Sequence, residues 1–280
     1  MRFTNYTPFC ADLEKHGIEY AAAHSAELGF EAVEFLDLCP IEQPLPSRIQ
    51  AEQVVQALRA NGLSVACYSL CADLSVPDRE ALLKELFLHV DFAAAIGSPF
   101  FHHTVVCGLE LPPNAPTYDE MLALVLPVVT AVARRCAEYG MTCLYEPQGM
   151  YFNGVDGLGR LFAEVKKTCP NVGICGDVGN SLFADTPATD IYDAFIDHMV
   201  HVHVKDYQVG QGEEGETTDL YSRSGIPIYD RDIGRGVTDF EYCFAKLKAA
   251  GYDGDIAFEI TGDDQTVRDA MQFVRDLWNR

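Results

Sequence analysis

Short apolar segments alternate along the chain with longer segments of helical periodicity. The short segments are rich in β-branched and aromatic residues, as strands are. They cover residues 2–6, 32–36, 64–70, 100–106, 141–146, 172–177, 199–204 and 255–260. Most of the longer segments end at Gly, Asn-Gly or Pro, as helix C-termini often do. They cover residues 18–28, 48–60, 79–96, 118–139, 156–168, 189–198, 239–250 and 264–278.

This alternation of eight predicted strands with eight predicted helices is the pattern of a (β/α)8 TIM barrel. The length of 280 residues suits that α/β fold. No linker or low-complexity segment divides the chain, so we expect a single domain over residues 1–280. A doubly wound sheet is the competing α/β fold, but it needs no closure and usually has fewer strands.

The seventh predicted strand contains an alternation of polar and branched apolar residues, HVHVKD at 201–206. Successive side chains of a strand lie on opposite faces, so His201, His203 and Lys205 share one face. In a barrel, the apolar face packs on the helices and the other face fills the lumen. The fifth, sixth and eighth strands have the same phase, with an acidic residue near the C-terminal end of the inward face. Barrel enzymes keep their active sites at this end.

Four candidate metal ligands therefore come from strands five to eight: Glu146, Asp177, His203 and Glu259. Three carboxylates and one imidazole suit a divalent cation that accepts oxygen and nitrogen ligands. Any one of them alone could be a hydrogen-bonded lumen group. Acids gathered in one pocket repel one another, however, unless a cation or protons intervene. We expect one divalent ion, with Mn²⁺ as the first choice and Mg²⁺, Co²⁺ or Zn²⁺ as alternatives.

Other polar residues near the strand ends are candidates for substrate contacts. His102 and His103 close the fourth strand, and one of them should face inward, although the register stays open. Lys205 could bind a substrate oxygen or form an ion pair with Asp206 or Glu259.

The segment after the seventh strand, residues 207–236, is long and glycine-rich. A loop of this length is usually a functional lid or disordered. Within it, Arg235 could meet a polar end of the substrate, or its GRG context could simply turn the chain into the next helix. His201 lies deeper on the inward face and is expected to support the site or to pack in the lumen.

Composition limits the partners and the compartment. The net charge of −22 disfavours nucleic acid and anionic membrane surfaces, because both require cationic residues. The ten cysteines include no CxxC pair and lie largely in apolar segments, as expected of reduced thiols in a cytoplasmic protein. The N-terminus lacks the apolar core of a signal peptide, and no apolar run is long enough to cross a bilayer.

Several motifs carry a resemblance to a known family. They are LGFEAVEF (28–35), LYEP (144–147), GDVGNS (176–181), HVHVKD (201–206), DIGRGVTDFEYCFAKLKAAGYDG (232–254) and IAFE (256–259). Their order and spacing resemble the sugar phosphate isomerase/epimerase family with the xylose isomerase-like barrel. That family holds its metal with Glu, Asp, His and Glu on strands five to eight. The resemblance therefore implies the four ligands already found from the strand phase.

Differences from two members of the family argue against a 3-epimerase of free ketoses and against endonuclease IV. Ketose 3-epimerases similar to this chain have a histidine where Asn180 stands, and a Gly-Glu pair where Lys205-Asp206 stands. Endonuclease IV, another relative, has more metal-binding histidines and must bind DNA. The missing histidines and the net charge of −22 argue against that activity here.

We therefore predict a metal-dependent isomerase or epimerase that acts on a sugar, an inosose or a sugar phosphate by proton transfer next to a carbonyl. Glu146 and Glu259 would exchange the proton. The predicted substrate contacts are His102, His103, Lys205, Asn180 and Arg235. A carbohydrate is the expected partner, and the chain could also form a homo-oligomer. A metal-dependent lyase that cleaves C-glycosides, and a non-catalytic sugar-binding subunit, are the alternatives on the same fold.

Overall fold

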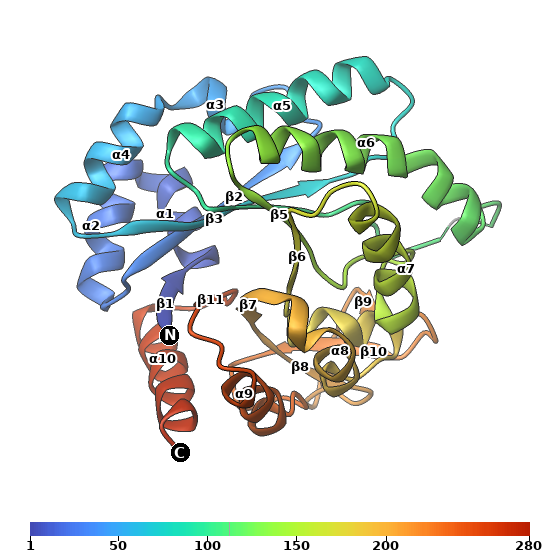
Figure 1. The fold of residues 1–280 in the computed structure, drawn as a ribbon. Coiled ribbons are helices and arrows are strands. Elements are labelled where there is room, and N and C mark those ends of the chain that lie inside the picture. Colours follow the sequence, from blue (N-terminus) through green and yellow to red (C-terminus); the bar gives the residue numbers. More distant parts are fainter. Residues whose placement is uncertain (112) are drawn as a thin grey trace.

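Eight parallel strands close into a barrel in the computed structural model, which describes residues 1–111 and 113–280 (Figure 1). The order of neighbours around the barrel is β1-β11-β7-β6-β5-β4-β3-β2. The strands are β1 (Arg2–Asn5), β2 (Ala32–Cys39), β3 (Ser64–Ala72), β4 (Phe100–His103), β5 (Thr142–Tyr145), β6 (Val172–Cys175), β7 (Met199–Val204) and β11 (Asp255–Phe258). The predicted TIM barrel is therefore confirmed, and each barrel strand overlaps one predicted strand.

Ten α-helices form in the described part of the chain, and they surround the barrel in Figure 1. They are α1 (Thr7–His16), α2 (Ile18–Leu28), α3 (Leu45–Arg48), α4 (Ala51–Ala60), α5 (Arg79–Ala95), α6 (Tyr118–Glu138), α7 (Gly154–Lys166), α8 (Ala188–Phe195), α9 (Phe240–Ala249) and α10 (Asp264–Trp278). Two short 3₁₀ helices, η1 (Asn180–Ala184) and η2 (Ile196–His198), follow β6 and α8. The periodicity did not predict α1, in which Phe9 is the only buried residue, because one buried position gives no apolar stripe.

The outer faces of the strands form the main core with the helices. Its fully buried side chains include Val33, Phe35, Tyr68, Phe101, Ile174, Val202, Ile256 and Phe258. Each such side chain stabilises the fold by about 1.5–3 kcal/mol relative to an exposed one. These residues alternate with the lumen residues, so the apolar core fixes which polar side chains point inward.

The segment after β7, whose length suggested a functional lid or disorder, forms a small antiparallel sheet. Its strands are β8 (Asp206–Val209), β9 (Leu220–Tyr221) and β10 (Pro227–Arg231), with β10 in the middle (Figure 1). Ile228 pairs with Val209 and Leu220, and it packs in a small cluster with Tyr207 and Phe183 of η1. This sheet lies on the C-terminal side of the barrel strands, where the predicted ligands also lie.

In the described residues, no helix is both long enough and apolar enough to cross a membrane. All ten cysteines are free.

Candidate active site

Four side chains from consecutive barrel strands meet at the C-terminal end of the lumen. The Nδ1 atom of His203 lies 3.2 Å from Glu146 Oε2, 3.6 Å from Glu259 Oε2 and 3.9 Å from Asp177 Oδ2. His203 pairs with Ala257 across the β7–β11 ladder, so Glu259, two residues further on, emerges on the same face. The four predicted metal ligands are therefore brought together.

The free atoms of this group fit a divalent cation. Glu146 Oε2, Asp177 Oδ2 and His203 Nδ1 are buried and make no hydrogen bond, although the Lys205 ammonium nitrogen lies 3.2 Å from Asp177 Oδ2. Buried polar atoms are rarely left without a partner, because each costs about 1–3 kcal/mol. The other oxygen of Asp177 accepts the N–H groups of Gly179 (2.8 Å) and Asn180 (2.6 Å), which leaves Oδ2 directed at the group. The three carboxylates suit Mn²⁺ or Mg²⁺, and the one imidazole suits an ion that also accepts nitrogen.

The charges in the group are partly balanced within the protein. Burial raises the pKa of Glu146, but the neighbouring histidines and Lys205 outweigh it and lower that pKa to about 2. Burial raises the pKa of Glu259, and the charge of Lys205 only partly offsets this. The two glutamates of the site therefore differ in their readiness to take a proton.

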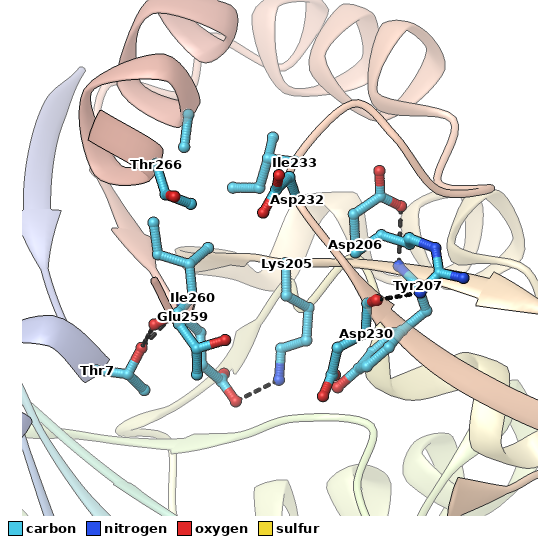
Figure 2. A pocket seen from close by; sticks show the side chains of 13 residues that line it. Thr7, Lys205, Asp206, Tyr207, Asp230, Asp232, Ile233, Glu259, Ile260 and Thr266 are labelled. Carbon is cyan, nitrogen blue, oxygen red and sulfur yellow. Dashed lines mark hydrogen bonds and ion pairs between the residues drawn. The ribbon is translucent and has the colours of Figure 1, made fainter. Parts of the chain in front are cut away.

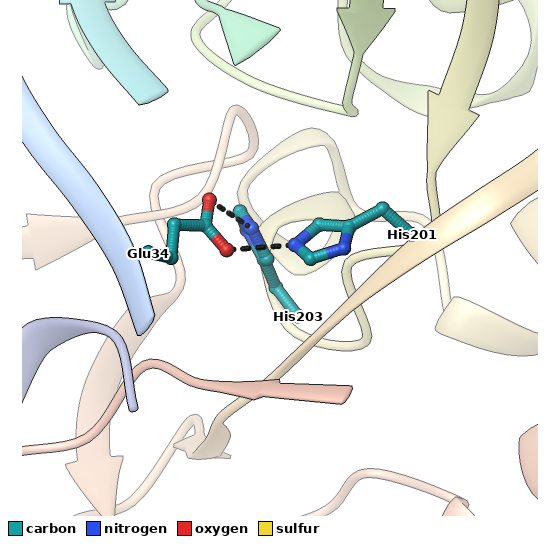
Figure 3. A group of neighbouring side chains, drawn as sticks. All are labelled: Glu34, His201 and His203. Carbon is teal, nitrogen blue, oxygen red and sulfur yellow. Dashed lines mark hydrogen bonds and ion pairs between the residues drawn. The ribbon is translucent and has the colours of Figure 1, made fainter. Parts of the chain in front are cut away.

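Glu34 is a central residue that the sequence reasoning missed. Its carboxylate is fully buried in the lumen and accepts hydrogen bonds from His201 Nε2 (2.7 Å) and His203 Nε2 (3.0 Å) (Figure 3). Burial raises the pKa of Glu34, but His203 and His201 hold it well below its usual range. A carboxylate that accepts a hydrogen bond from the Nε2–H group of His203 leaves Nδ1 free for a metal. A lone acid in the middle of an apolar strand, AVEFL, was the signal in the sequence.

Lys205 forms an ion pair with Glu259, one of the two partners considered for it. Its ammonium nitrogen lies 2.5 Å from Glu259 Oε1 and 3.2 Å from Asp177 Oδ2, and it donates to Asn180 Oδ1 at 3.0 Å. Lys205 and Asn180 are thus both at the site. Gly179 makes this possible, because a Cβ there would lie 2.6 Å from Lys205 Cγ.

Asp206, the other partner considered, holds the turn after β10 instead. Its carboxylate accepts the N–H groups of Gly234 (2.9 Å), Gly236 (2.8 Å) and Thr238 (3.1 Å). A Cβ at Gly236 would lie only 2.3 Å from this carboxylate. Arg235, within the turn, is exposed and is not among the residues that line the neighbouring cavity. The GRG motif therefore serves the turn, and the structure does not bring Arg235 to the site.

The register of β4 decides between the two adjacent histidines. His102 faces the lumen: Nδ1 lies 3.0 Å from Ser69 Oγ, and Nε2 lies 3.4 Å from Glu146 Oε1. Burial lowers the pKa of His102 to about 4, which keeps its imidazole neutral. His103 is on the outer face, where its ring packs on Tyr145 and its Nδ1 bonds to the carbonyl of Thr104. The structure therefore brings His102, but not His103, to the site.

A cavity of about 250 Å³ opens beside Lys205 and Glu259 (Figure 2). Its walls include Thr7 and the segment Asp230 to Asp232 at the end of β10. Glu259 is the most accessible of the four candidate ligands, with 29% of its side chain exposed. A small polar molecule in this cavity would therefore reach Glu259 and Lys205 first.

Comparison with known proteins agrees with this geometry. The family model described as "Xylose isomerase-like TIM barrel" matches residues 22–277. The chain belongs to this family. The motif-based resemblance is thereby confirmed.

Three proteins that are similar to this chain are informative. Ketose 3-epimerase of Arthrobacter globiformis is 25% identical over 95% of this chain and 86% of its own length. Inosose dehydratase of Geobacillus thermodenitrificans (strain NG80-2) is 23% identical over 74% of this chain and 72% of its own length. The structure of 3-keto-D-glucoside 4-epimerase from E. coli is 20% identical, with a TM-score of 0.73 over 99% of both chains.

Proposed function

We propose that this member of the xylose isomerase-like family is a divalent-metal-dependent isomerase or epimerase. It would move a proton at the carbon next to a carbonyl in a sugar or an inosose. The observation that carries the proposal is the convergence of three carboxylates and one imidazole beside a polar cavity, with buried atoms of Glu146, Asp177 and His203 that make no hydrogen bond. The named activities of the relatives, on ketoses, keto-glucosides and inososes, support the substrate class.

Glu146, Asp177, His203 and Glu259 would hold the metal ion, with Mn²⁺ as the first choice. A bound divalent ion stabilises the negative charge that develops on a carbonyl oxygen when a neighbouring carbon loses its proton. The carboxylate of Glu34 would keep His203 in the orientation that binding needs.

The proton itself is assigned to the two glutamates. Glu146 and Glu259 follow β5 and β11, which are separated by β6 and β7, so they approach a substrate from different sides. Two bases on opposite faces of a planar intermediate can remove a proton from one face and return it to the other. Glu259 borders the cavity and is also held by Lys205, which fixes its carboxylate in place.

The charges around the cavity favour a substrate without a phosphate group. Lys205 is already paired with two carboxylates, and Arg231 makes a two-point ion pair with Glu216, at 2.8 and 2.7 Å. Asp230 and Asp232 add further negative charge to the lining. A phosphate dianion would therefore find no uncommitted cation among the described lining residues.

The helix after the last barrel strand supports the same inference. TIM barrels frequently bind phosphate at a helix N-terminus in this region, where free N–H groups point at the ligand. Here the Asp263 side chain accepts the N–H groups of Gln265 (3.1 Å) and Thr266 (3.0 Å). A carboxylate thus already occupies the place of the anion at the start of α10.

Dehydration is the second candidate reaction, because the named activity of one relative is that of an inosose dehydratase. Loss of water from an inosose begins with the same removal of a proton beside a carbonyl. It then needs an acid to protonate the departing hydroxyl group. The Lys205 ammonium group lies 2.5 Å from Glu259, where its positive charge would stabilise negative charge on a departing oxygen. Burial lowers the pKa of Lys205, but the two carboxylates beside it outweigh this and raise that pKa.

One experiment tests the proposed function and separates the two reactions. Metal-stripped protein is reloaded with Mn²⁺ and incubated in D₂O with a panel of free ketoses, keto-glucosides and inososes. We expect metal-dependent incorporation of deuterium beside the carbonyl, followed by NMR signals of an epimer or isomer. A product lighter by one water identifies the dehydratase instead. Absence of both exchange and product across the panel, with full metal occupancy, contradicts the proposal.

A further inference from the structure

A second group of metal-binding residue types lies outside the barrel lumen, between β2 and α5. Cys39, Glu85 and His89 each offer one ligand atom, and these three atoms lie within 4.8 Å of one another. Cys39 is the last residue of β2. Glu85 and His89 are four residues apart on α5, so they lie one above the other on the same face of that helix.

The two softer ligands of this group are held inside the protein. Cys39 is 4% exposed and His89 is completely buried, whereas Glu85 is only partly covered. Glu85 also accepts the N–H of Ile41 through Oε1 at 2.8 Å, which fixes its carboxylate beside the end of β2. The site would thus have a buried interior and one side open to water.

One ring nitrogen of His89 has a hydrogen-bond partner among the described residues, and the other has none. Its Nδ1 lies 2.8 Å from the hydroxyl group of Tyr68, and Asp37 Oδ2 lies 3.8 Å from the same nitrogen. Its Nε2 is buried and makes no hydrogen bond. Histidine ligands characteristically donate one ring N–H to a nearby acceptor, which leaves the other nitrogen for the metal.

We infer that Cys39, Glu85 and His89 form a second cation site, for Zn²⁺ or another divalent ion that prefers thiolate and imidazole. Cysteine, histidine and carboxylate are the ligands that zinc takes in proteins. On binding, the Cys39 thiol would release its proton to solvent, and thiolate and carboxylate together would balance the two charges of the ion. Water would complete the coordination on the open side.

Such an ion would join the C-terminal end of β2 to α5. The three ligands come from β2 and α5, which the chain connects through residues Pro40 to Asp78. The ion would therefore crosslink the two ends of this long connection. Binding to the native state alone raises thermal stability. The site is therefore expected to act on stability and not on the proton-transfer chemistry of the lumen.

Cobalt spectroscopy tests this site separately from the lumen site. Metal-free protein carrying Asp177→Ala, which weakens the lumen site, is titrated with Co²⁺. We expect a near-ultraviolet absorption band from thiolate-to-cobalt charge transfer that reaches its limit at about one ion per chain. Adding Cys39→Ser should abolish this band, and Glu85→Gln should weaken Co²⁺ binding at least tenfold.

Cys175 is the matched control, because it is a buried cysteine close to Glu146 and His203 in the lumen. Cys175→Ser should leave the band and the affinity unchanged. If Cys175→Ser removes the band and Cys39→Ser does not, the thiolate site is in the lumen and the inference is wrong. Absence of any thiolate band in the Asp177→Ala protein overturns it as well.

Thermal unfolding supplies the second readout. Zn²⁺ should raise the melting temperature of the Asp177→Ala protein, and this increase should vanish in the Cys39→Ser, Asp177→Ala double variant. An equal increase in both proteins contradicts the inference.

Discussion

Replacing Glu34 by Gln should weaken the metal site although none of the four proposed ligands is replaced. The carboxylate of Glu34 is fully buried and accepts three hydrogen bonds, from His201 at 2.7 Å, from His203 at 3.0 Å and from the Ser69 hydroxyl group at 2.5 Å. An amide has nearly the same shape, but only one of its two polar atoms can accept a hydrogen bond. The other would place an N–H₂ donor against an imidazole N–H.

The expected magnitude follows from that loss. A hydrogen bond to a charged group contributes about 1.5–3 kcal/mol, and Gln can keep only one of the two histidine bonds, because these reach different carboxylate oxygens. The free energy of unfolding of the metal-free protein should therefore fall by about 2 kcal/mol. Loss of a group that orients a metal-binding histidine typically weakens metal binding by about 10–100-fold, and we expect Mn²⁺ affinity to fall in that range.

Urea denaturation of the metal-free protein and calorimetric titration with Mn²⁺ measure these two effects. Glu27→Gln is the control, because Glu27 is an exposed glutamate on α2 and should change neither quantity. If Glu34→Gln binds Mn²⁺ as tightly as the wild type, Glu34 does not orient His203, and the reasoning fails. A loss of stability with unchanged Mn²⁺ affinity would show that Glu34 matters only for packing in the lumen.

Three further predictions test the two catalytic glutamates, the hydrogen bonds of His24 and the expected lack of DNA binding. Glu146→Gln and Glu259→Gln should still take up metal at high concentration, yet turnover should fall by at least about 100-fold, because an amide cannot accept a proton; full activity of both metal-loaded variants refutes their role. Burial lowers the pKa of His24, but hydrogen bonds to Asp12 (2.7 Å) and Asp264 (3.2 Å) outweigh it and raise that pKa. Protonated His24 therefore stabilises the fold fully below about pH 6.5, the usual pKa of histidine. This stabilisation is lost as the pH rises through the higher pKa of His24 in the folded state. The free energy of unfolding, measured by urea denaturation, should thus differ more between the wild type and Asp12→Asn at about pH 5.5 than at about pH 8.5. An equal difference at both pH values would contradict this role of His24. With a net charge of −22, the protein should show no measurable affinity for abasic duplex DNA at physiological salt in a fluorescence anisotropy titration; binding or cleavage of such DNA would contradict the assignment.

The sequence was sufficient for the barrel and for the four proposed ligands because both depend on periodicity. Inward and outward positions alternate within a strand. The pattern alone therefore predicts the inward face, near the C-terminal end of each strand, for Glu146, Asp177, His203 and Glu259. Glu34 could not be recognised in the same way. Its partners are 167 and 169 residues away in the chain, and nothing local to Glu34 reveals them.

Other differences between prediction and structure also have local physical causes. His102 and His103 are adjacent at the end of a strand, and the pattern there cannot say which one faces the lumen until the register with β3 and β5 is known. The sheet formed by β8, β9 and β10 was missed because its strands are short and one of its turns is glycine-rich. Arg235 belongs to a turn whose shape depends on Asp206, which lies 28 residues before Gly234.

The small sheet after β7 has a consequence for how this protein can diversify. Its strands pair with one another, and its central residue Ile228 packs with Tyr207 and Phe183 in a cluster separate from the barrel core. Mutations in it therefore leave the barrel largely undisturbed, while the end of β10 still forms part of the cavity wall. We therefore expect substitutions at the end of β10 to change which substrate the cavity accepts, with less effect on the residues at the ends of the barrel strands.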